Sequence, residues 1–212
     1  MIETEHTLIE RLREKPTDAD WTRFYRLYEK PILAVAATRS LSDGDCRDVL
    51  QETVMKMFRH GFARYDRKRG RFTPFLFGIA RDCAIDALRR KAKRNQREVE
   101  LDSAIFHNLQ IDPSQNPMGA AELRGQQVLV ATALDYLLLK GSFAPKTVEM
   151  FKALVFDEVS PDEVARMFNT SRGNVDQAKS TILKKLRPMY EGLDQGMDME
   201  QALVYATAAL KA

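Results

Sequence analysis

Apolar residues recur along most of this chain at three- and four-residue steps, the spacing that places them on one face of an α-helix. Alternation of apolar and polar residues, which is typical of strands, is absent. The pattern predicts helices at residues 18–36, 45–60, 73–97, 120–139, 145–156, 160–168 and 172–190. We therefore predict an all-α fold with two small helical domains, a flexible linker between them and a helix-turn-helix in the C-terminal domain.

Individual residues predict where these helices begin and end. Pro31 is expected to kink or divide the first helix, because proline lacks the N–H that the preceding turn needs. Ser42 or Asp43 is expected to cap the second helix and Gly61 to end it. Thr73 is a candidate N-cap of the third helix. Apolar residues on the second helix predict one continuous buried stripe: Cys46, Val49, Leu50, Val54, Met57 and Phe58.

The stretch from Tyr65 to Arg97 combines an aromatic cluster with a basic helix. Residues 64–97 hold twelve Lys and Arg against three acids, a charge of about +9 in a chain whose net charge is only +3. A basic helix face is often only solvated, and phenylalanines at helical spacing usually belong to a core. Here the aromatic residues directly precede the basic helix, the combination that unstacked bases and a phosphate backbone require. The stretch is thus a candidate nucleic-acid site.

Composition narrows the class of protein. Hydrophobic residues make up 44% of the chain and charged residues 30%, which is ordinary for a globular protein. No apolar run reaches membrane-spanning length, and the N-terminus lacks the apolar core of a signal peptide, so we expect a cytoplasmic protein without membrane insertion. Cys46 and Cys83 fall on apolar helix faces and are expected to be reduced core thiols. The three histidines show no ligand spacing, so we expect neither a metal nor another cofactor.

A change in composition after Arg97 predicts the domain boundaries. Residues 98–140 hold six acids against two basic residues, and Asp112–Pro117 has turn chemistry without periodicity. We predict a first domain at 1–97, an acidic linker at 98–119, a second domain at 120–190 and a C-terminal extension at 191–212. The extension is weakly amphipathic, and we expect it either to form a short helix on the second domain or to fray.

The last two helices of the second domain follow the helix-turn-helix pattern. Ser160 and Pro161 mark a helix start, small Ala165 permits close approach, Asn169 suits a left-handed turn, and Val175 opens the next apolar stripe. Amide and basic side chains can read base edges, whereas hydroxyls and lysines suit phosphates. The outward candidates on the second helix are Arg172, Asn174, Gln177, Ser180, Thr181 and Lys184. Helical hairpins without any DNA role also match this pattern.

Taken together, these features resemble the bacterial RNA polymerase sigma factors, and the compact two-domain layout looks like the extracytoplasmic-function (ECF) group. Residues 40–60 are similar to the polymerase-binding helix of that family, with Asp48, Leu50, Gln51 and Glu52 in the D-x-[VL]-Q-E arrangement. Residues 65–94 are similar to the segment that captures the minus-ten promoter element. The resemblance covers roughly 21–94 for the promoter-melting domain and 143–189 for the domain that reads the minus-thirty-five element.

The resemblance implies roles for particular residues. Asp48, Gln51, Glu52 and Lys56 would dock on the clamp helices of the largest subunit of core RNA polymerase, and the second domain on its flap. The non-template strand at the minus-ten element would be held by Phe72, Phe75, Arg81, Asp82, Arg89, Arg90, Lys91, Lys93 and Arg94. The six candidates on the second helix of the helix-turn-helix would face the minus-thirty-five element. The acidic linker would run toward the RNA exit path of the polymerase. An anti-sigma protein, common in the family, would be expected to cover these faces.

Two departures from the family pattern affect base preference. Phe75 stands where the family usually has Trp, which keeps a stacking surface but loses the indole donor. Asp82 replaces an Asn often found near the flipped minus-ten base. Because a carboxylate repels phosphate and lacks the amide donor, we expect either a different base preference or an Asp82 held by Arg81 or Arg89.

Two other classes of function remain open at this point. A stand-alone helix-turn-helix regulator would need neither the aromatic-basic stretch nor the Asp48–Glu52 pattern. An enzyme such as a nucleic-acid hydrolase would need clustered carboxylates or a nucleophile with its base, and the acids here are dispersed. We therefore expect a DNA-binding specificity subunit without catalytic activity of its own.

Overall fold

A computed structural model describes residues 7–39, 41–98 and 117–210, with side chains left out at 94–98 and 117–118. The described residues are helical without strands, as the periodicity predicts. They belong to two compact units: an N-terminal unit, Leu12–Leu129, and a C-terminal unit that joins Met1–Arg11 to Val130–Ala212. The predicted linker lies almost wholly outside the described residues. The predicted domain boundary at residue 120 differs from this division, because the first half of one helix packs within the N-terminal unit.

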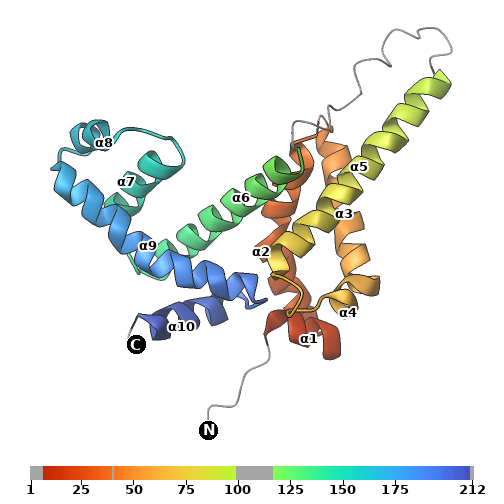
Figure 1. The fold of residues 1–212 in the computed structure, drawn as a ribbon, viewed down its shortest axis with the longest axis horizontal. Helices are drawn as coiled ribbons and strands as arrows, with labels where there is room; N and C mark the ends of the chain where they lie inside the picture. The colour runs from red at the N-terminus through yellow and green to blue at the C-terminus, as the bar shows by residue number, and fades with distance from the viewer. Residues whose placement is uncertain (1–6, 40, 99–116, 211–212) are drawn as a thin grey trace. The chain divides into compact units, whose positions relative to one another are not determined.

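Three long helices form the body of the N-terminal unit: α2 (Asp18–Ala37), α3 (Asp43–Lys56) and α5 (Phe72–Glu98) (Figure 1). Capping boxes start two of them, since Thr17 and Asp20 exchange hydrogen bonds at α2, and Ser42 and Asp45 do so at α3. Of the kink or division expected at Pro31, the division is wrong: α2 runs through it undivided, and Pro31 is buried in the core with Ile32. Its burial against apolar neighbours offsets the missing hydrogen bond.

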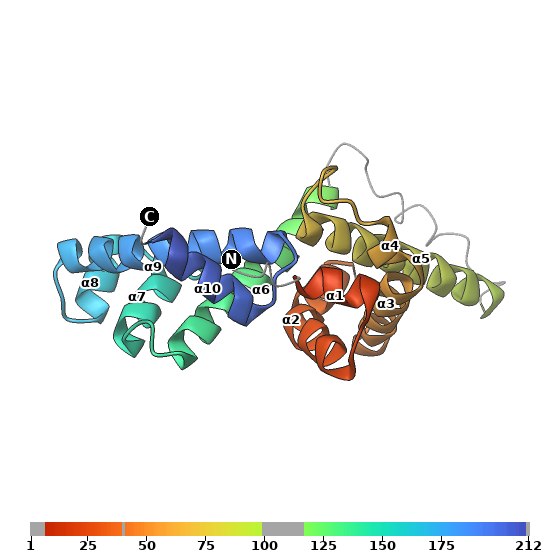
Figure 2. The ribbon, with the colours of Figure 1, turned by 90° about the horizontal axis from the view of Figure 1, so that it is seen from below.

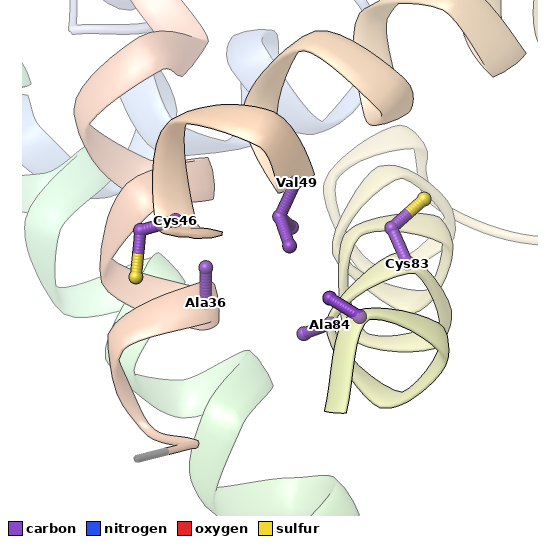
Figure 3. Packing of buried hydrophobic residues seen from close by; sticks show 6 residues of the cluster. Ala36, Cys46, Val49, Cys83 and Ala84 are labelled. Carbon is purple, nitrogen blue, oxygen red and sulfur yellow. The ribbon is translucent and has the colours of Figure 1, made fainter. Parts of the chain in front are cut away.

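Two clusters of side chains hold these helices together. One is aromatic: Phe24 and Tyr28 of α2 lie against Phe62 and Phe72, with ring centroids 5.0–6.4 Å apart. The other contains small residues of all three helices: Ala36, Cys46, Val49, Cys83, Ala84 and Ala87. Both cysteines are buried free thiols, as predicted, and their sulfur atoms point away from each other (Figure 3).

The end of α3 departs from the prediction. Gly61 does not end the helix, which instead passes through a π-helical turn, η1 (Met57–Gly61), into the short α4 (Phe62–Arg64). Met57 fills the space beside this glycine, since a Cβ on Gly61 would lie 2.5 Å from the Met57 sulfur. The extra residue of a π turn changes the direction in which neighbouring side chains point around the helix axis. Phe58 is therefore 60% exposed rather than part of the buried stripe, and Thr53 is buried in its place.

The third helix, α5, begins one residue earlier than predicted, at Phe72. Thr73 is therefore not the N-cap but a fully buried residue of the first turn. Pro74 still costs no hydrogen bond, because the first N–H groups of a helix have no partner within it.

Helix α6 (Pro117–Leu139) contributes its first half to the N-terminal unit. Its buried residues Ala121, Gly125 and Leu129 recur every fourth position and share one face. At Gly125 a Cβ would lie 2.7 Å from Val35 Cγ2 and 3.1 Å from two ring carbons of Phe77. Glycine thus permits a backbone approach that any other residue would obstruct.

The C-terminal unit contains α7 (Pro145–Val155), α8 (Pro161–Met167) and α9 (Arg172–Asp194) around one small core. The local predictions for this hairpin are confirmed: Ser160 caps α8, Asn169 has a positive φ of 45°, and Val175 is fully buried. Ala165 is buried in the same core, with Met150, Ala153, Val164 and Ala178.

A further helix, α10 (Met199–Ala209), packs along α9 in the same unit (Figure 2). The crossing is close, since a Cβ on Gly192 would lie 3.1 Å from the Ala202 Cα. The turn between α9 and α10 rests on the start of α1 (Leu8–Glu14), which the sequence did not predict: Ile9 N–H donates to the Gly196 carbonyl at 3.1 Å. Of the two expectations for the C-terminal extension, packing on the preceding helix is the one that is confirmed.

None of the helices in the described ranges has the length and apolar content needed to cross a membrane.

Candidate functional site

The outer face of α3 carries a mixed polar and apolar surface. Asp48, Gln51, Met55 and Phe58 are all exposed and succeed one another at three- and four-residue steps. Exposed Met55 and Phe58, at 46% and 60%, are unusual on a helix whose other face already fills a core. Such a combination suits a protein partner.

An open groove lies beside this face, between α2 and α3. Its lining residues are Trp21, Thr22, Phe24, Tyr25, Arg26 and Val54. The ring of Phe58 extends the groove, since its centroid lies 5.5 Å from that of Trp21. The groove is mainly apolar, and Tyr25 is 42% exposed on its rim. Trp21 lies on the apolar side of its helix by sequence spacing, and nothing in that spacing distinguishes a groove residue from a core residue.

The other two polymerase-binding candidates on α3 face α5 instead. Arg90 Nη2 donates to Glu52 Oε2 at 2.9 Å, and Lys56 Nζ lies 3.6 Å from Asp86 Oδ2. A third ion pair joins Lys91 to Asp45. The hydrogen bond to Glu52 raises the pKa of Arg90. Of the four candidates, Asp48 and Gln51 are exposed, whereas Glu52 and Lys56 also hold the two helices together.

The two aromatic candidates for stacking on DNA, Phe72 and Phe75, differ in how far their rings are exposed. Phe72 is fully buried among Phe24, Tyr28, Phe62 and Tyr65, so neither ring face is open to a base. Phe72 is therefore a core residue, and its assignment to DNA binding is wrong for this conformation. Phe75 is half-buried, with its ring 5.5 Å from that of Tyr65.

The outer face of α5 presents alternating charges. Asp82, Asp86, Arg89 and Lys93 share this face by spacing, and Arg89 Nη1 lies 3.4 Å from Asp86 Oδ1. Lys93 is exposed, and the side chain of Arg94 lies outside the described residues. The charge of about +9 counted along the sequence already includes Asp82 and Asp86, and the pairs to Asp45 and Glu52 of α3 offset part of the rest. Exposed pairs of this kind are worth only about 0–1 kcal/mol, so phosphates can displace them.

Arg81 occupies the flank of α5 that faces α6. Its Nη2 lies 2.9 Å from Asp82 Oδ1, and its Nη1 lies 3.0 Å from Glu122 Oε1. The expectation that Arg81 or Arg89 holds Asp82 is met by Arg81. The Arg81 side chain is only 15% exposed, so little of its guanidinium faces solvent.

A basic loop precedes α5 and was not among the predicted site residues. Its four basic side chains are all exposed: Arg67, Lys68, Arg69 and Arg71. Two hydrogen bonds shape it, because Lys68 N–H donates to Asp66 Oδ1 at 2.9 Å and the Tyr65 hydroxyl donates to the Gly70 carbonyl at 3.2 Å. The signal was available in the sequence as the run Arg67–Arg71, where charge is concentrated in a turn instead of along a helix.

All six candidates on α9 are exposed: Arg172, Asn174, Gln177, Ser180, Thr181 and Lys184. Gln177, Ser180 and Lys184 share the outermost face by spacing, and exposed Arg187 continues it three residues later. Arg172 is turned to α8, where its Nη1 lies 3.2 Å from Asp162 Oδ2. Gln177 Nε2 donates to the Thr181 hydroxyl at 3.3 Å, which orients its amide along the helix.

Within the described ranges, no group of three or more His, Cys, Asp or Glu side chains lies close enough together to hold a metal ion.

Comparison with known families gives one match. Residues 24–94 match the family model Sigma-70 region 2, and this segment covers all of α3 and most of α2 and α5 in the N-terminal unit. The matched segment is about a third of the chain, 71 of its 212 residues. The chain has no significant match among curated proteins or solved structures.

Proposed function

We propose that this protein is a sigma factor of the ECF type, which directs core RNA polymerase to specific promoters and opens them. The observation that carries the proposal is the match of residues 24–94 to Sigma-70 region 2, since the exposed surfaces of α3 and α5 fall within it. As a binding subunit it needs no cofactor and no catalytic residue, and it acts in the cytoplasm with the polymerase.

The polymerase would dock on the outer face of α3 and the adjoining groove. Asp48 and Gln51 offer polar contacts, while Tyr25, Met55 and Phe58 offer apolar area that is otherwise exposed to water. Aromatic residues and methionine are enriched in protein interfaces because they bury much area at small entropic cost. The partner surface would be the clamp helices of the largest subunit, and a second contact would join the C-terminal unit to the flap.

Promoter DNA would bind along α5 and the basic loop before it. Lys68 and Arg69 in the loop, with Arg89 and Lys93 on the helix, supply phosphate contacts, and Phe75 supplies a partly exposed ring for a base. Melting needs no covalent step. Bases that unstack gain ring contacts and phosphate contacts only in the open state, and this difference in binding shifts the equilibrium toward open DNA.

The α8–α9 hairpin would read the minus-thirty-five element in the major groove. Gln177 suits bidentate contact with adenine, whereas Lys184 and Arg187 suit phosphates or guanine. The N-cap Ser171 and the positive φ at Asn169 support a defined entry of α9, because they fix where the helix begins. An anti-sigma protein that covers these faces is a further expected partner.

The test is binding of the full chain to core RNA polymerase. The double variant Asp48→Ala/Gln51→Ala removes two exposed side chains without breaking the ion pairs to α5. We expect nanomolar binding by the wild type and at least about tenfold weaker binding by the variant, which is 1.4 kcal/mol. Glu200→Ala, which removes an exposed carboxylate on α10, is the matched control and should bind as the wild type does.

The alternative, a stand-alone helix-turn-helix regulator, predicts the opposite pattern. Tight sequence-specific binding to duplex DNA by the chain alone, together with no binding to core polymerase, would overturn the sigma-factor proposal.

A further inference from the structure

Helix α6 places a carboxylate on Arg81, a guanidinium on the flank of α5 that the resemblance to sigma factors assigns to minus-ten DNA. Arg81 Nε and Nη2 donate to Asp82 Oδ1 at 3.1 and 2.9 Å, and Nη1 donates to Glu122 Oε1 at 3.0 Å. Asp82 is the neighbour of Arg81 on α5, but Glu122 is 41 residues away, across the predicted linker. The Glu122 contact therefore exists only while the first half of α6 is docked on α5.

The docking of α6 depends on close packing as well as on charge. Gly125 lies three residues after Glu122, and a Cβ there would meet Val35 of α2 and Phe77 of α5 at 2.7 and 3.1 Å. Ala121 and Leu129 are buried on the same face. The first half of α6 thus packs against α2 and α5, and this packing places Glu122 within hydrogen-bond distance of Arg81.

Charge explains what this contact does to the DNA surface. One guanidinium between two carboxylates forms a cluster with a net charge of −1, and that cluster repels phosphate. The five N–H donors of an arginine are directional, and three are already used here. Bidentate binding of a phosphate at Arg81 competes with both carboxylates, so it becomes more favourable when Glu122 leaves.

We propose that Glu122 is an internal competitor of DNA: it occupies Arg81 while α6 is docked, and it lowers the affinity of the α5 surface for single-stranded DNA until α6 is displaced. This inference rests on the proposed function, since it assigns regulation to the same DNA surface. Glu122 acts through Arg81, so it is a regulating residue and not one that touches DNA.

The experiment measures binding of the full chain to a labelled single-stranded oligothymidylate by fluorescence anisotropy over a range of salt concentrations. Glu122→Gln removes the competing charge and keeps the side-chain shape. We expect roughly two- to fivefold tighter binding, the range that corresponds to release of one partly exposed ion pair. One added phosphate contact should also steepen the slope of log K against log salt by about 0.7.

Three further variants separate competition from a general change in charge or folding. Glu149→Gln removes an exposed carboxylate of α7, changes the net charge by the same amount and should match the wild type. Arg81→Gln should abolish the gain from Glu122→Gln, because no guanidinium remains to be released. Gly125→Leu should undock α6 and tighten binding without a change in charge, with circular dichroism as the check that the helices persist.

The outcomes distinguish this inference from the proposed function when core polymerase binding is measured on the same samples. If Glu122→Gln leaves affinity and salt slope unchanged while polymerase still binds, Glu122 is only structural and the inference is overturned alone. Absence of single-stranded DNA binding in every variant overturns it as well. If polymerase binding is absent too, the sigma-factor proposal falls with it.

Discussion

Arg90 of α5 donates a hydrogen bond from Nη2 to Oε2 of Glu52 on α3, at 2.9 Å. The two residues come from different predicted surfaces, one for DNA and the other for polymerase. Their pairing means that a change at either surface alters the helix packing that positions the other. Loss of function after mutation of Glu52 is therefore poor evidence for direct contact with a partner.

Glu52→Ala should lower the free energy of unfolding by about 0.5–1 kcal/mol, because it breaks partly exposed pairs to both Arg90 and Lys56. Urea denaturation measures this change. Asp48→Ala, on the exposed face, should stay within about 0.5 kcal/mol of the wild type. Equal destabilisation by the two variants would contradict a bridging role for Glu52.

Gly196→Ala should destabilise the C-terminal unit by about 1–3 kcal/mol, since its φ is +85° and the new Cβ would lie 2.6 Å from Ile9 Cγ1. Thermal and chemical unfolding measure the loss. The control is Gly78→Ala within α5, where no atom lies within 4 Å of the added Cβ. That change should stabilise the protein by up to about 1 kcal/mol.

Asn169→Val should cost about 1–2 kcal/mol, because a β-branched residue does not tolerate the φ of 45° in the turn between α8 and α9. Asn169→Gly should remain within a few tenths of a kcal/mol, since glycine accepts this conformation. Both values come from denaturant titrations. Equal stability of the two variants would show that the turn adopts another backbone conformation.

Stability should depend on pH through Asp45, the partner of the N-cap Ser42 in the capping box of α3. Hydrogen bonds from the Ser42 side chain and backbone lower the pKa of Asp45 below 3.8, so its carboxylate stabilises the folded protein above pH 3.8. This contribution is lost as the pH falls through the folded-state pKa. Asp45→Asn should therefore lower the Tm at neutral pH, and the gap to the wild type should shrink below pH 3.8. A gap that persists unchanged well below that pH would contradict the linkage.

Gln177 and Lys184, two turns apart on the outer face of α9, should affect duplex DNA binding differently under the proposed function. Lys184→Ala should weaken binding to all sequences and reduce the salt slope by about 0.9, the effect of one lost phosphate contact. Gln177→Ala should cost about 1–3 kcal/mol at one base pair and leave the slope unchanged. Competition titrations with single-base variants of a selected site measure both effects. Uniform loss from Gln177→Ala would show that its amide does not read a base.

The sequence predicted some residues of the candidate surfaces correctly as exposed and misplaced or missed others. The exposed positions Asp48 and Gln51 came directly from helical spacing, because the apolar stripe of α3 leaves them outside. Phe72 was assigned to DNA although it is buried, since a phenylalanine next to a basic helix has the same local pattern whether its ring faces core or solvent. The groove beside Trp21 was missed because it arises where two helices meet.

Periodicity, capping residues and turn chemistry determined most of the helices, the start of α3 near Ser42 and the left-handed turn at Asn169, but not α1. These features depend on neighbours within about four residues, which the sequence contains. The tertiary structure alone decided which polar faces are paired and where the first half of α6 docks. Glu52 with Arg90 and Glu122 with Arg81 are 38 and 41 residues apart, so their contacts arise only from the packing of whole helices.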